Sequence, residues 1–489
     1  MNAARPLWTS AEIAAATNGS AGRRFDAAGV SIDSRKVVVG DLFVALHGPN
    51  FDGHDFVAAA LTSGAAGALV DRLPAGIAAA MPVVVVTDTL QGLQDLGRAA
   101  RARSEARIAA VTGSVGKTST KEALKAALSG FGRTFASEGN LNNHWGAPLS
   151  LARMPRDAEF GVFELGMNHA GEITPLSQMV RPEVSIITSV EAVHIEFFNS
   201  VVEIADAKAE IMDGMEPGGA VVLPRDNPHY ARLAEHAKRR GIGRVFSFGA
   251  AAGSDARLVE CAVMSGGSRI VAEIGGKSVS YTLGLPGAHQ AMNSLAVLAA
   301  VAALGLDVSA AAEALAGLKA LKGRGARERL ALPAGTITLI DESYNASPAS
   351  VRAALATLAT VAPEGRGRRV VVLGDMRELG ETGPDLHRGL APALVSAGVD
   401  AAFFVGPLMR GLHDALPQAR RAGHWPDSVS AIQPLLAALG PGDIVLVKGS
   451  LGTRMAPIVE ALRAANHAGS RADEVDRAST GRQKAVNGD

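Results

Sequence analysis

The chain has 489 residues, of which 47% are hydrophobic and only 4% aromatic, and its Lys and Arg residues balance its Asp and Glu residues at 48 each. This length predicts about three domains, and the wealth of small aliphatic residues favours helices packed on parallel sheets, so we expect an α/β fold throughout. Because the net charge is zero, no overall field favours nucleic acid or an anionic membrane, and we expect neither as a partner.

A single cysteine, Cys261, excludes an internal disulfide framework and a Cys-rich metal site. The first residues lack the basic-then-apolar pattern of a signal peptide, and no apolar run approaches the length of a membrane span. These features predict a cytoplasmic location without membrane insertion.

The first hundred or so residues contain short strand-like runs at 30–32 and 42–46, separated by turn-forming residues, and predict a small α/β domain. From residue 108 onward, apolar strands alternate with helices, which predicts a doubly wound nucleotide-binding domain with a parallel sheet. Its predicted strands cover residues 108–111, 161–165, 184–187 and 220–223.

Short alternating segments between residues 258 and 285 predict antiparallel strands that close this sheet, and a helix follows from His289. A linker rich in Lys, Gly and Arg at 321–325 precedes a third, Rossmann-like domain with βαβ spacing. Its predicted strands cover residues 336–340, 370–373, 402–405 and 444–447. The domains therefore span residues 1–100, 101–322 and 323–465, and the polar residues 466–489 predict a disordered tail.

The strongest local signal is the run Thr112-Gly113-Ser114-Val115-Gly116-Lys117-Thr118, between a predicted strand and a predicted helix at 119–128. Glycines let backbone N–H groups approach phosphate oxygens, Lys117 supplies positive charge, and Thr118 supplies a hydroxyl ligand for Mg²⁺. The general phosphate-loop pattern has glycine where this chain has Val111, but the strand–loop–helix context still favours phosphate binding over a simple turn.

Two polar residues follow the next strands. Glu164 ends one apolar strand, where an isolated buried carboxylate is costly, so it predicts a Mg²⁺ ligand, with a plain ion pair as the alternative. His194 follows another strand and is expected at the same carboxyl edge, where doubly wound sheets bind ligands.

The phosphate loop, Asn140-Leu141-Asn142-Asn143, Glu164-Leu165-Gly166-Met167 and His194 resemble, in order and spacing, the central domain of the Mur ligase family. The resemblance implies an ATP-dependent ligase with two Mg²⁺ ions, held by Thr118, Glu164 and His194, and with Asn142 or Asn143 near the reacting groups. It also implies that ATP contacts Gly113, Ser114, Gly116, Lys117, Thr118, Ser119, Asn293 at the adenine, Arg324 at the phosphates and Asp341 at the ribose.

The third domain carries the runs Asp341-Glu342-Ser343-Tyr344-Asn345 and Leu373-Gly374-Asp375-Met376-Arg377-Glu378, which resemble the family members that add D-alanyl-D-alanine to UDP-N-acetylmuramoyl-tripeptide. Tyr344, Asn345, Asp375 and Met376 would contact substrate. In the first domain, Ser34, Arg35, Asp52 and His54 resemble the element that holds the uridine nucleotide. The resemblance also implies a monomer.

Lys208 lies in a predicted helical run at 201–212, and its neighbours three and four residues away, Ile204, Ala205, Ile211 and Met212, are all apolar. This spacing predicts a buried lysine with a neutral, nucleophilic amine, the alternative being a lysine at the edge of the apolar face. The resemblance implies that CO₂ carbamylates Lys208 and that the carbamate binds the second Mg²⁺ beside His194.

Three other activities remain as alternatives. The sister ligase that adds the third amino acid carries an Asp-Asn-Pro-Arg motif in its third domain, and here Asp226-Asn227-Pro228-His229 is only a look-alike in the central domain. Folylpolyglutamate synthetase shares the ATPase core but lacks the amino-terminal domain. A switch or transport ATPase would need the phosphate loop alone.

Overall fold

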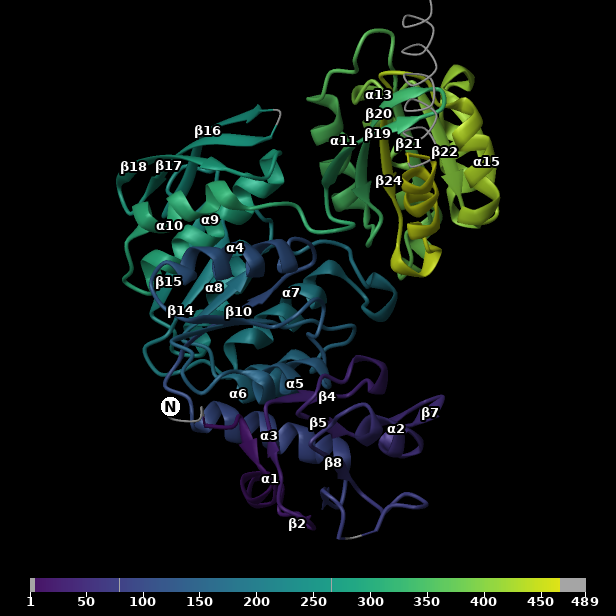
Figure 1. Ribbon diagram of the computed structural model, residues 1–489. Helices are drawn as coiled ribbons and strands as arrows, with labels where there is room; N and C mark the ends of the chain where they lie inside the picture. Colours follow the sequence, from purple (N-terminus) through teal and green to yellow (C-terminus); the bar gives the residue numbers. More distant parts are fainter. Residues whose placement is uncertain (1–4, 79, 265, 467–489) are drawn as a thin grey trace, which may run out of the picture.

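The computed structural model describes residues 5–78, 80–264 and 266–466. Among these residues the strands form three main sheets of five, nine and six strands, which follow one another along the chain. Figure 1 shows the first sheet region in purple, the central region in blue to green, and the third region in green to yellow. The predicted α/β class and three-domain organisation are confirmed. The predicted disordered tail, apart from residue 466, lies outside the described residues.

The first domain is built on a mostly parallel sheet in the order β2-β9-β8-β5-β4. Its strands are β2 (Ser20–Ala21), β4 (Gly29–Ser31), β5 (Asp41–Val44), β8 (Gly67–Val70) and β9 (Val83–Val85), and its helices are α1 (Ser10–Thr17), α2 (Val57–Thr62) and α3 (Thr89–Ala102). Short ribbons pair β1 (Trp8–Thr9) with β3 (Asp26–Ala27), and β6 (His47–Gly48) with β7 (Phe51–Asp52). The two predicted strands correspond to β4 and β5.

The central domain has the sheet order β11-β12-β10-β13-β14-β15-β16-β17-β18, parallel up to β16 and antiparallel beyond it. Its strands are β10 (Arg107–Thr112), β11 (Thr134–Ala136), β12 (Phe160–Glu164), β13 (Val184–Ile187), β14 (Ala220–Pro224), β15 (Arg244–Gly249), β16 (Ala256–Met264), β17 (Gly267–Ile274) and β18 (Lys277–Leu283). Its helices are α4 (Lys117–Ser129), α5 (Gly146–Arg153), α6 (Ile173–Val180), α7 (Val201–Ala209), α8 (Tyr230–Arg239), α9 (Ala288–Ala303) and α10 (Val308–Ala314). The expected antiparallel closure is therefore present.

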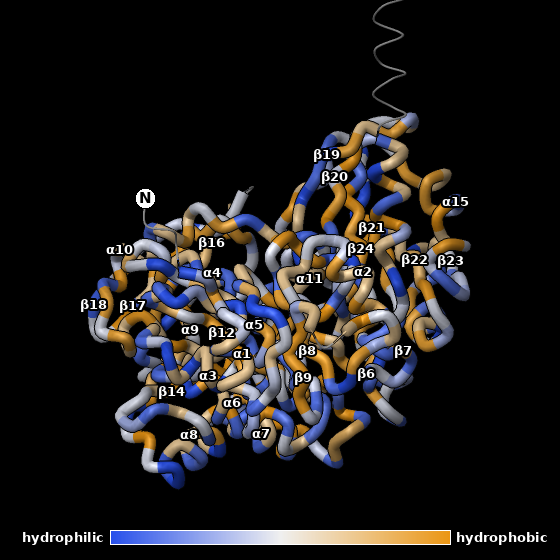
Figure 2. Tube along the Cα trace, turned by 60° about the horizontal axis from the view of Figure 1, so that its bottom comes forward, coloured by the Kyte–Doolittle hydropathy of each residue, from blue (hydrophilic) through white to orange (hydrophobic). Residues whose placement is uncertain are grey.

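Helices cover both faces of the central sheet. One apolar cluster joins the sheet to α4, α9 and α10, and the other joins it to α5–α8. The second cluster also contains Leu93 and Leu96 of α3 and Trp8, so the first and central domains share one apolar core. Figure 2 shows the hydrophobic strands enclosed by more hydrophilic segments. Within the described part of the chain, every helix is too short or too polar to span a bilayer.

The third domain has the sheet order β19-β20-β24-β21-β22-β23, parallel except for the β19–β20 pair. Its strands are β19 (Ala326–Leu332), β20 (Gly335–Glu342), β21 (Arg369–Gly374), β22 (Ala401–Val405), β23 (Arg421–Trp425) and β24 (Ile444–Lys448). Its helices are α11 (Pro348–Ala359), α12 (Gly383–Arg388), α13 (Ala391–Ser396), α14 (Arg410–Ala415), α15 (Ser428–Ala438) and a last helix at 456–466. Two apolar clusters of its own fill the two faces of this sheet.

Candidate active site

A cleft of about 350 Å³ lies between the carboxyl edge of the central sheet and the third domain. Its central wall comes from the loop after β10, the start of α4, the loops after β12 and β13, and the first turns of α9. Its third-domain wall comes from the loop after β20 and the start of α11. The predicted site residues that line it are Ser114, Gly116, Lys117, Thr118, Ser119, Asn142, Glu164, His194, Asn293, Arg324, Tyr344 and Asn345.

The loop between β10 and α4 is tightly constrained by its glycines. Gly113 and Gly116 have φ of 149° and 88°, and a Cβ on Gly113 would lie only 1.9 Å from Thr188 Oγ1. Lys117 begins α4, two residues earlier than predicted, and its Nζ donates to the Gly113 carbonyl at 2.6 Å. Burial lowers the pKa of Lys117, although the Glu164 carboxylate opposes this effect. The loop thus directs a helix N-terminus and a buried amine at the same point in the cleft.

Glu164 is a buried carboxylate that is held by neutral donors. The Thr118 hydroxyl donates to one of its oxygens at 2.7 Å, and the Asn142 amide donates to the other at 2.7 Å. The residue is 2% exposed and forms no ion pair with the residues that the structure describes, so the plain ion-pair interpretation finds no support. Carboxylate, hydroxyl and amide oxygens together are the donor chemistry that suits Mg²⁺.

Lys208 lies in the last turn of α7 and is 2% exposed, which excludes a lysine at the edge of the apolar face. The helical run is shorter than expected, since α7 ends at Ala209 and a 3₁₀ turn, η4 (Glu210–Met212), follows. Within the described chain its amine has no hydrogen bond or ion pair, and burial, together with the nearby Lys117, lowers its pKa well below the usual value. A neutral amine is therefore favoured at this position.

His194 lies close to both lysines and to the third domain. Its Nδ1 is hydrogen-bonded to the Glu378 carboxylate, and its backbone is left-handed with φ of 61°. Burial lowers the pKa of His194, the Glu378 carboxylate raises it, and the charges of Lys117 and Lys208 lower it further. These effects place His194, Lys117 and Lys208 in one electrostatic environment.

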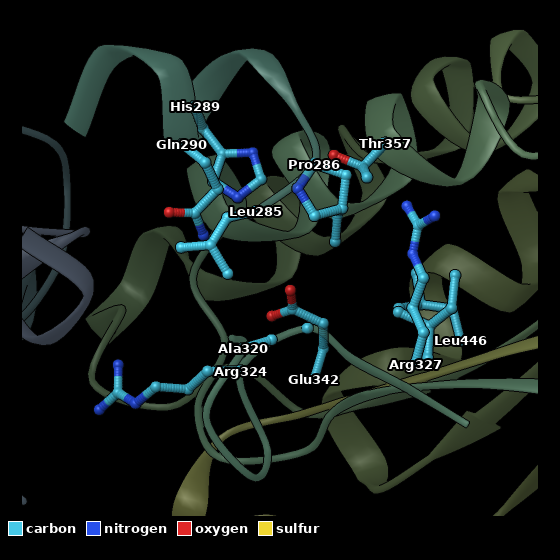
Figure 3. Close-up of a pocket in the computed structure, with 13 residues that line it drawn as sticks. Leu285, Pro286, His289, Gln290, Ala320, Arg324, Arg327, Glu342, Thr357 and Leu446 are labelled. Carbon is cyan, nitrogen blue, oxygen red and sulfur yellow. The ribbon is translucent and has the colours of Figure 1, made fainter. Parts of the chain in front are cut away.

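The nucleotide side of the cleft is bounded by α9 and by the linker to the third domain. Asn293 lies against the phosphate loop, since a Cβ on Gly116 would be 2.6 Å from its Oδ1. The Arg324 guanidinium stacks 4.1 Å above the ring of Tyr344. An adjoining small pocket lies between α9 and β20, and Figure 3 shows the Glu342 carboxylate directed towards the side of His289.

Asp341 does not reach the cleft, contrary to the ribose contact expected for it. Its carboxylate is 0% exposed and accepts hydrogen bonds from Gly323 N, from Ser343 and from the Arg463 guanidinium. Successive residues of a strand point to opposite faces, so Glu342, the next residue of β20, lines the pocket instead. This alternation is the signal that could have identified Glu342 from the sequence.

Asp375 and Met376 are also buried within the third domain rather than exposed to substrate. The Asp375 carboxylate accepts from Met409 N at 3.0 Å, and a Cβ on Gly406 would lie 2.4 Å from its Cγ. Met376 is 0% exposed, and its N–H donates to His387 Nε2 at 2.9 Å. Both residues hold the loop after β21 against its neighbours and do not line the cleft in this arrangement, so their substrate contacts stay predictions.

Asn142 and Asn143, the two alternatives near the reacting groups, make different contacts. Asn142 lines the cleft, whereas Asn143 Oδ1 accepts from Trp145 N and Gly146 N at 3.2 and 3.0 Å, at the start of α5. The Asn143 side chain therefore satisfies two backbone N–H groups in the turn that leads into α5.

The four first-domain residues expected at the uridine nucleotide do not line the cleft. Ser34 lies in a 3₁₀ turn, η1 (Ser34–Lys36), in which the exposed Arg35 pairs with its neighbour Asp33. His54 is buried, with Nδ1 bonded to Asp52 at 2.7 Å and Nε2 accepting from the Asp71 N–H at 3.1 Å. Because both ring nitrogens are hydrogen-bonded within the loop, His54 organises this loop, and its contact with the uridine nucleotide stays a prediction.

Comparisons with known proteins find one family along all three domains. Family models described as "Mur ligase family, catalytic domain", "Mur ligase middle domain" and "Mur ligase, glutamate ligase domain" match residues 26–101, 111–301 and 327–451. The chain is 36% identical to the UDP-N-acetylmuramoyl-tripeptide–D-alanyl-D-alanine ligase of Escherichia coli (strain K12), over 89% of this chain and 93% of that protein.

Solved structures show the same likeness over almost the whole length. The crystal structure of MurF from Acinetobacter baumannii has a TM-score of 0.81 at 29% identity and covers 94% of this chain and 99% of that one. The MurF ligase of Thermotoga maritima in complex with ADP has a TM-score of 0.75 at 26% identity, covering 90% of this chain and 98% of that one. With its phosphate loop, its buried Glu164 and these matches across all three sheets, the chain belongs to the Mur ligase family.

Proposed function

We propose that the chain is the ATP-dependent ligase that joins D-alanyl-D-alanine to UDP-N-acetylmuramoyl-tripeptide, giving the pentapeptide precursor of peptidoglycan with ADP and phosphate. The observation that carries this proposal is the cleft itself, in which a phosphate loop on one domain faces a second domain that can present an amine. The named relatives support the identity of the substrates. On this proposal the enzyme works in the cytoplasm, where ATP is available, as a monomer.

The nucleotide would bind with its phosphates on the loop between β10 and α4. Lys117 would exchange its bond to the Gly113 carbonyl for a phosphate oxygen, and Arg324 would approach from the linker. Thr118 and Glu164 would hold one Mg²⁺, and His194 with a modified Lys208 would hold a second. Bound Mg²⁺ would neutralise charge that develops on the transferred phosphoryl group.

Lys208 has the surroundings that carbamylation requires. Its neutral Nζ would attack CO₂, form an N–C bond and lose a proton, which leaves a carbamate with one negative charge. This charge would lie near the ammonium of Lys117 and the ring of His194, so it would replace an unpaired buried amine by a compensated anion.

Amide formation needs an activated carboxylate. A terminal oxygen of the tripeptide would attack the γ-phosphorus of ATP, breaking the bond to ADP and giving an acyl phosphate. The amine of D-alanyl-D-alanine would then attack the acyl carbon, and phosphate would leave as the amine loses its proton. The protein's own contribution is alignment, since Lys117, Asn142 and the third-domain residues Tyr344 and Asn345 surround the space where the groups meet.

The division of labour follows the three proposed domains, 1–100 for the uridine nucleotide, 101–322 for ATP and 323–465 for the dipeptide. Asp226-Asn227-Pro228-His229, the look-alike of the sister ligase motif, lies after β14, and Asp226 accepts from Ala250 N and Ala251 N. This turn is part of the central domain, so it gives no support to the sister activity.

The decisive experiment measures ADP release by the purified chain in the presence of UDP-N-acetylmuramoyl-tripeptide. We expect ADP release to require D-alanyl-D-alanine and to match pentapeptide formation one to one. If ADP release instead required a free amino acid together with the uridine nucleotide that carries only a dipeptide, the sister ligase would be favoured. ADP release that depends on neither D-alanyl-D-alanine nor a free amino acid would favour a switch or transport ATPase.

A further inference from the structure

Two residues with unusual backbone conformations meet at the boundary between the central and third domains. Among the described residues, only five residues other than glycine have positive φ, and His194 (61°) and Glu378 (62°) are two of them. Their side chains are hydrogen-bonded to each other through Nδ1 and Oε2. Such conformations cost energy and persist where the surrounding structure enforces them, so both loops are shaped around this contact.

The contact is supported by the backbone on both sides. Glu196 N donates to the carbonyl of Glu378 at 3.3 Å. Gly380, with φ of 55°, packs so closely that a Cβ there would lie 3.3 Å from Glu196 Cα. Ile195 packs against the apolar cluster of the third domain. The turns η3 (Ile195–Phe197) and η6 (Gly380–Thr382) thus form a small docking surface beside the cleft.

This geometry determines which nitrogen of His194 is available. A carboxylate at Nδ1 keeps the proton on Nδ1 and leaves the lone pair on Nε2, which is the form of imidazole that binds a metal ion. Histidines that bind metals usually donate their second N–H to a carboxylate or carbonyl of this kind. Here the carboxylate belongs to a different domain from the histidine.

We propose that Glu378 is a positioning residue that fixes His194 in its metal-binding orientation only when the third domain is docked, so that domain closure and Mg²⁺ binding reinforce each other. The inference rests on the proposed role of His194 in holding Mg²⁺. Closing the third domain would complete the second metal position, and a metal ion at this position would in turn favour the closed arrangement.

The test measures Mn²⁺ binding to the full chain by the electron paramagnetic resonance signal of free Mn²⁺, with a non-hydrolysable ATP analogue present. We expect wild type to bind two ions and Glu378→Ala to weaken the second by about 10- to 100-fold, the range typical of lost outer-shell partners. Glu378→Gln, whose amide oxygen can still accept from Nδ1, should fall between them. Glu460→Ala, an exposed change in the last helix of the third domain and outside η3 and η6, is the matched control and should bind as wild type.

A double-mutant cycle separates positioning from general damage to the interface. If Glu378 acts through His194, adding Glu378→Ala to His194→Ala should not change Mn²⁺ binding further. In small-angle X-ray scattering, adding the ATP analogue and Mn²⁺ should reduce the radius of gyration less in Glu378→Ala than in wild type.

Three results would overturn the inference: wild-type Mn²⁺ binding by Glu378→Ala, an equal loss in both backgrounds, or a single Mn²⁺ in wild type. A different result, ADP release that does not require D-alanyl-D-alanine, would contradict the proposed ligase activity. The two failures are therefore distinguishable.

Discussion

The central-domain wall of the cleft presents Glu164 to the open space, whereas the third-domain wall buries Asp341 and Asp375 in its own interior. All three acids lie at or just after the carboxyl end of a parallel strand. They differ in their partners. Glu164 is hydrogen-bonded only by the neutral side chains of Thr118 and Asn142. Asp341 is hydrogen-bonded by the Arg463 guanidinium, and Asp375 by a backbone N–H at η7 (Pro407–Met409). A carboxylate at a strand end therefore indicates a ligand site only if no cationic side chain or loop N–H of the protein already binds it.

The largest effect that this comparison predicts comes from Lys117, the cation on the central wall. Lys117→Ala should reduce ligation and ATP turnover together by at least about 100-fold, because the Lys117 amine lies at the phosphate loop and would offset phosphate charge there. Steady-state turnover with each substrate checks this, and circular dichroism checks folding. Lys125→Ala, exposed on the same helix, is the control and should keep wild-type turnover.

The next effect concerns Lys208, the buried amine beneath the same wall. Lys208→Ala should be nearly inactive, and short carboxylic acids should partly restore turnover by filling the vacated space with an anionic ligand. Mass spectrometry or ¹³C NMR of the wild type in ¹³CO₂-enriched buffer should detect the carbamate. Full activity of the untreated variant would contradict the proposed role of Lys208 on the central wall.

A smaller effect distinguishes the two neighbouring acids of β20. Glu342 lines the cleft and pairs at 2.9 Å with Lys448, which is buried, so Glu342→Gln should change KM or kcat by about tenfold and also lower Tm, because Lys448 loses its anionic partner. Asp341→Asn should leave turnover nearly unchanged and cost about 1–3 kcal/mol of unfolding free energy, because Arg463, which keeps Glu328 as a partner, loses the buried Asp341 carboxylate. If Asp341→Asn instead raised only the KM for ATP, the result would support the expected contact between Asp341 and the ribose.

Much of this site was predictable from the sequence where the signal is local. The residues Gly113 to Gly116 form a continuous loop whose backbone geometry follows from its glycines, and Lys117 and Thr118 begin the helix after it. The apolar neighbours of Lys208 predicted its burial, which the structure confirms. The third-domain wall was not predictable in this way. The partners of Asp341 and Asp375 lie at Arg463 and Met409, 122 and 34 residues further along the chain, so no local pattern reveals them.

The fold shows the same distinction. The long apolar strands of the central and third sheets were predicted to within one or two residues, because buried parallel strands have continuous apolar runs. Edge and partly exposed strands such as β15 and β23 were missed, since their polar residues and glycines resemble loops. Glu378 was likewise missed as a contact of His194, because only the docking of two domains brings them together.

The smallest effect on catalysis is expected at Asp375. Asp375→Ala leaves the Met409 N–H without its acceptor in a buried loop, so it should cost about 1–2 kcal/mol of unfolding free energy and leave the ratio of KM values for D-alanyl-D-alanine and ATP unchanged. Chemical denaturation and steady-state kinetics measure the two quantities. A selective rise in the KM for D-alanyl-D-alanine with unchanged stability would instead support a direct contact between Asp375 and the substrate.

The pH dependence gives a second measurement on the same residue, because burial raises the pKa of the Asp375 carboxyl above its usual value of 3.8. The folded state then retains a proton that the unfolded state releases, so this group's contribution to stability is full below the unfolded pKa and is lost as pH rises through the folded pKa. Asp375→Asn removes that titration while keeping an oxygen that can accept from Met409 N. Its stability relative to wild type should therefore improve as pH rises from about 4, the unfolded pKa, towards neutrality, in denaturation curves recorded at several pH values. Parallel curves for the two proteins would show that the carboxyl is already ionised and solvated, as a substrate-facing residue would be.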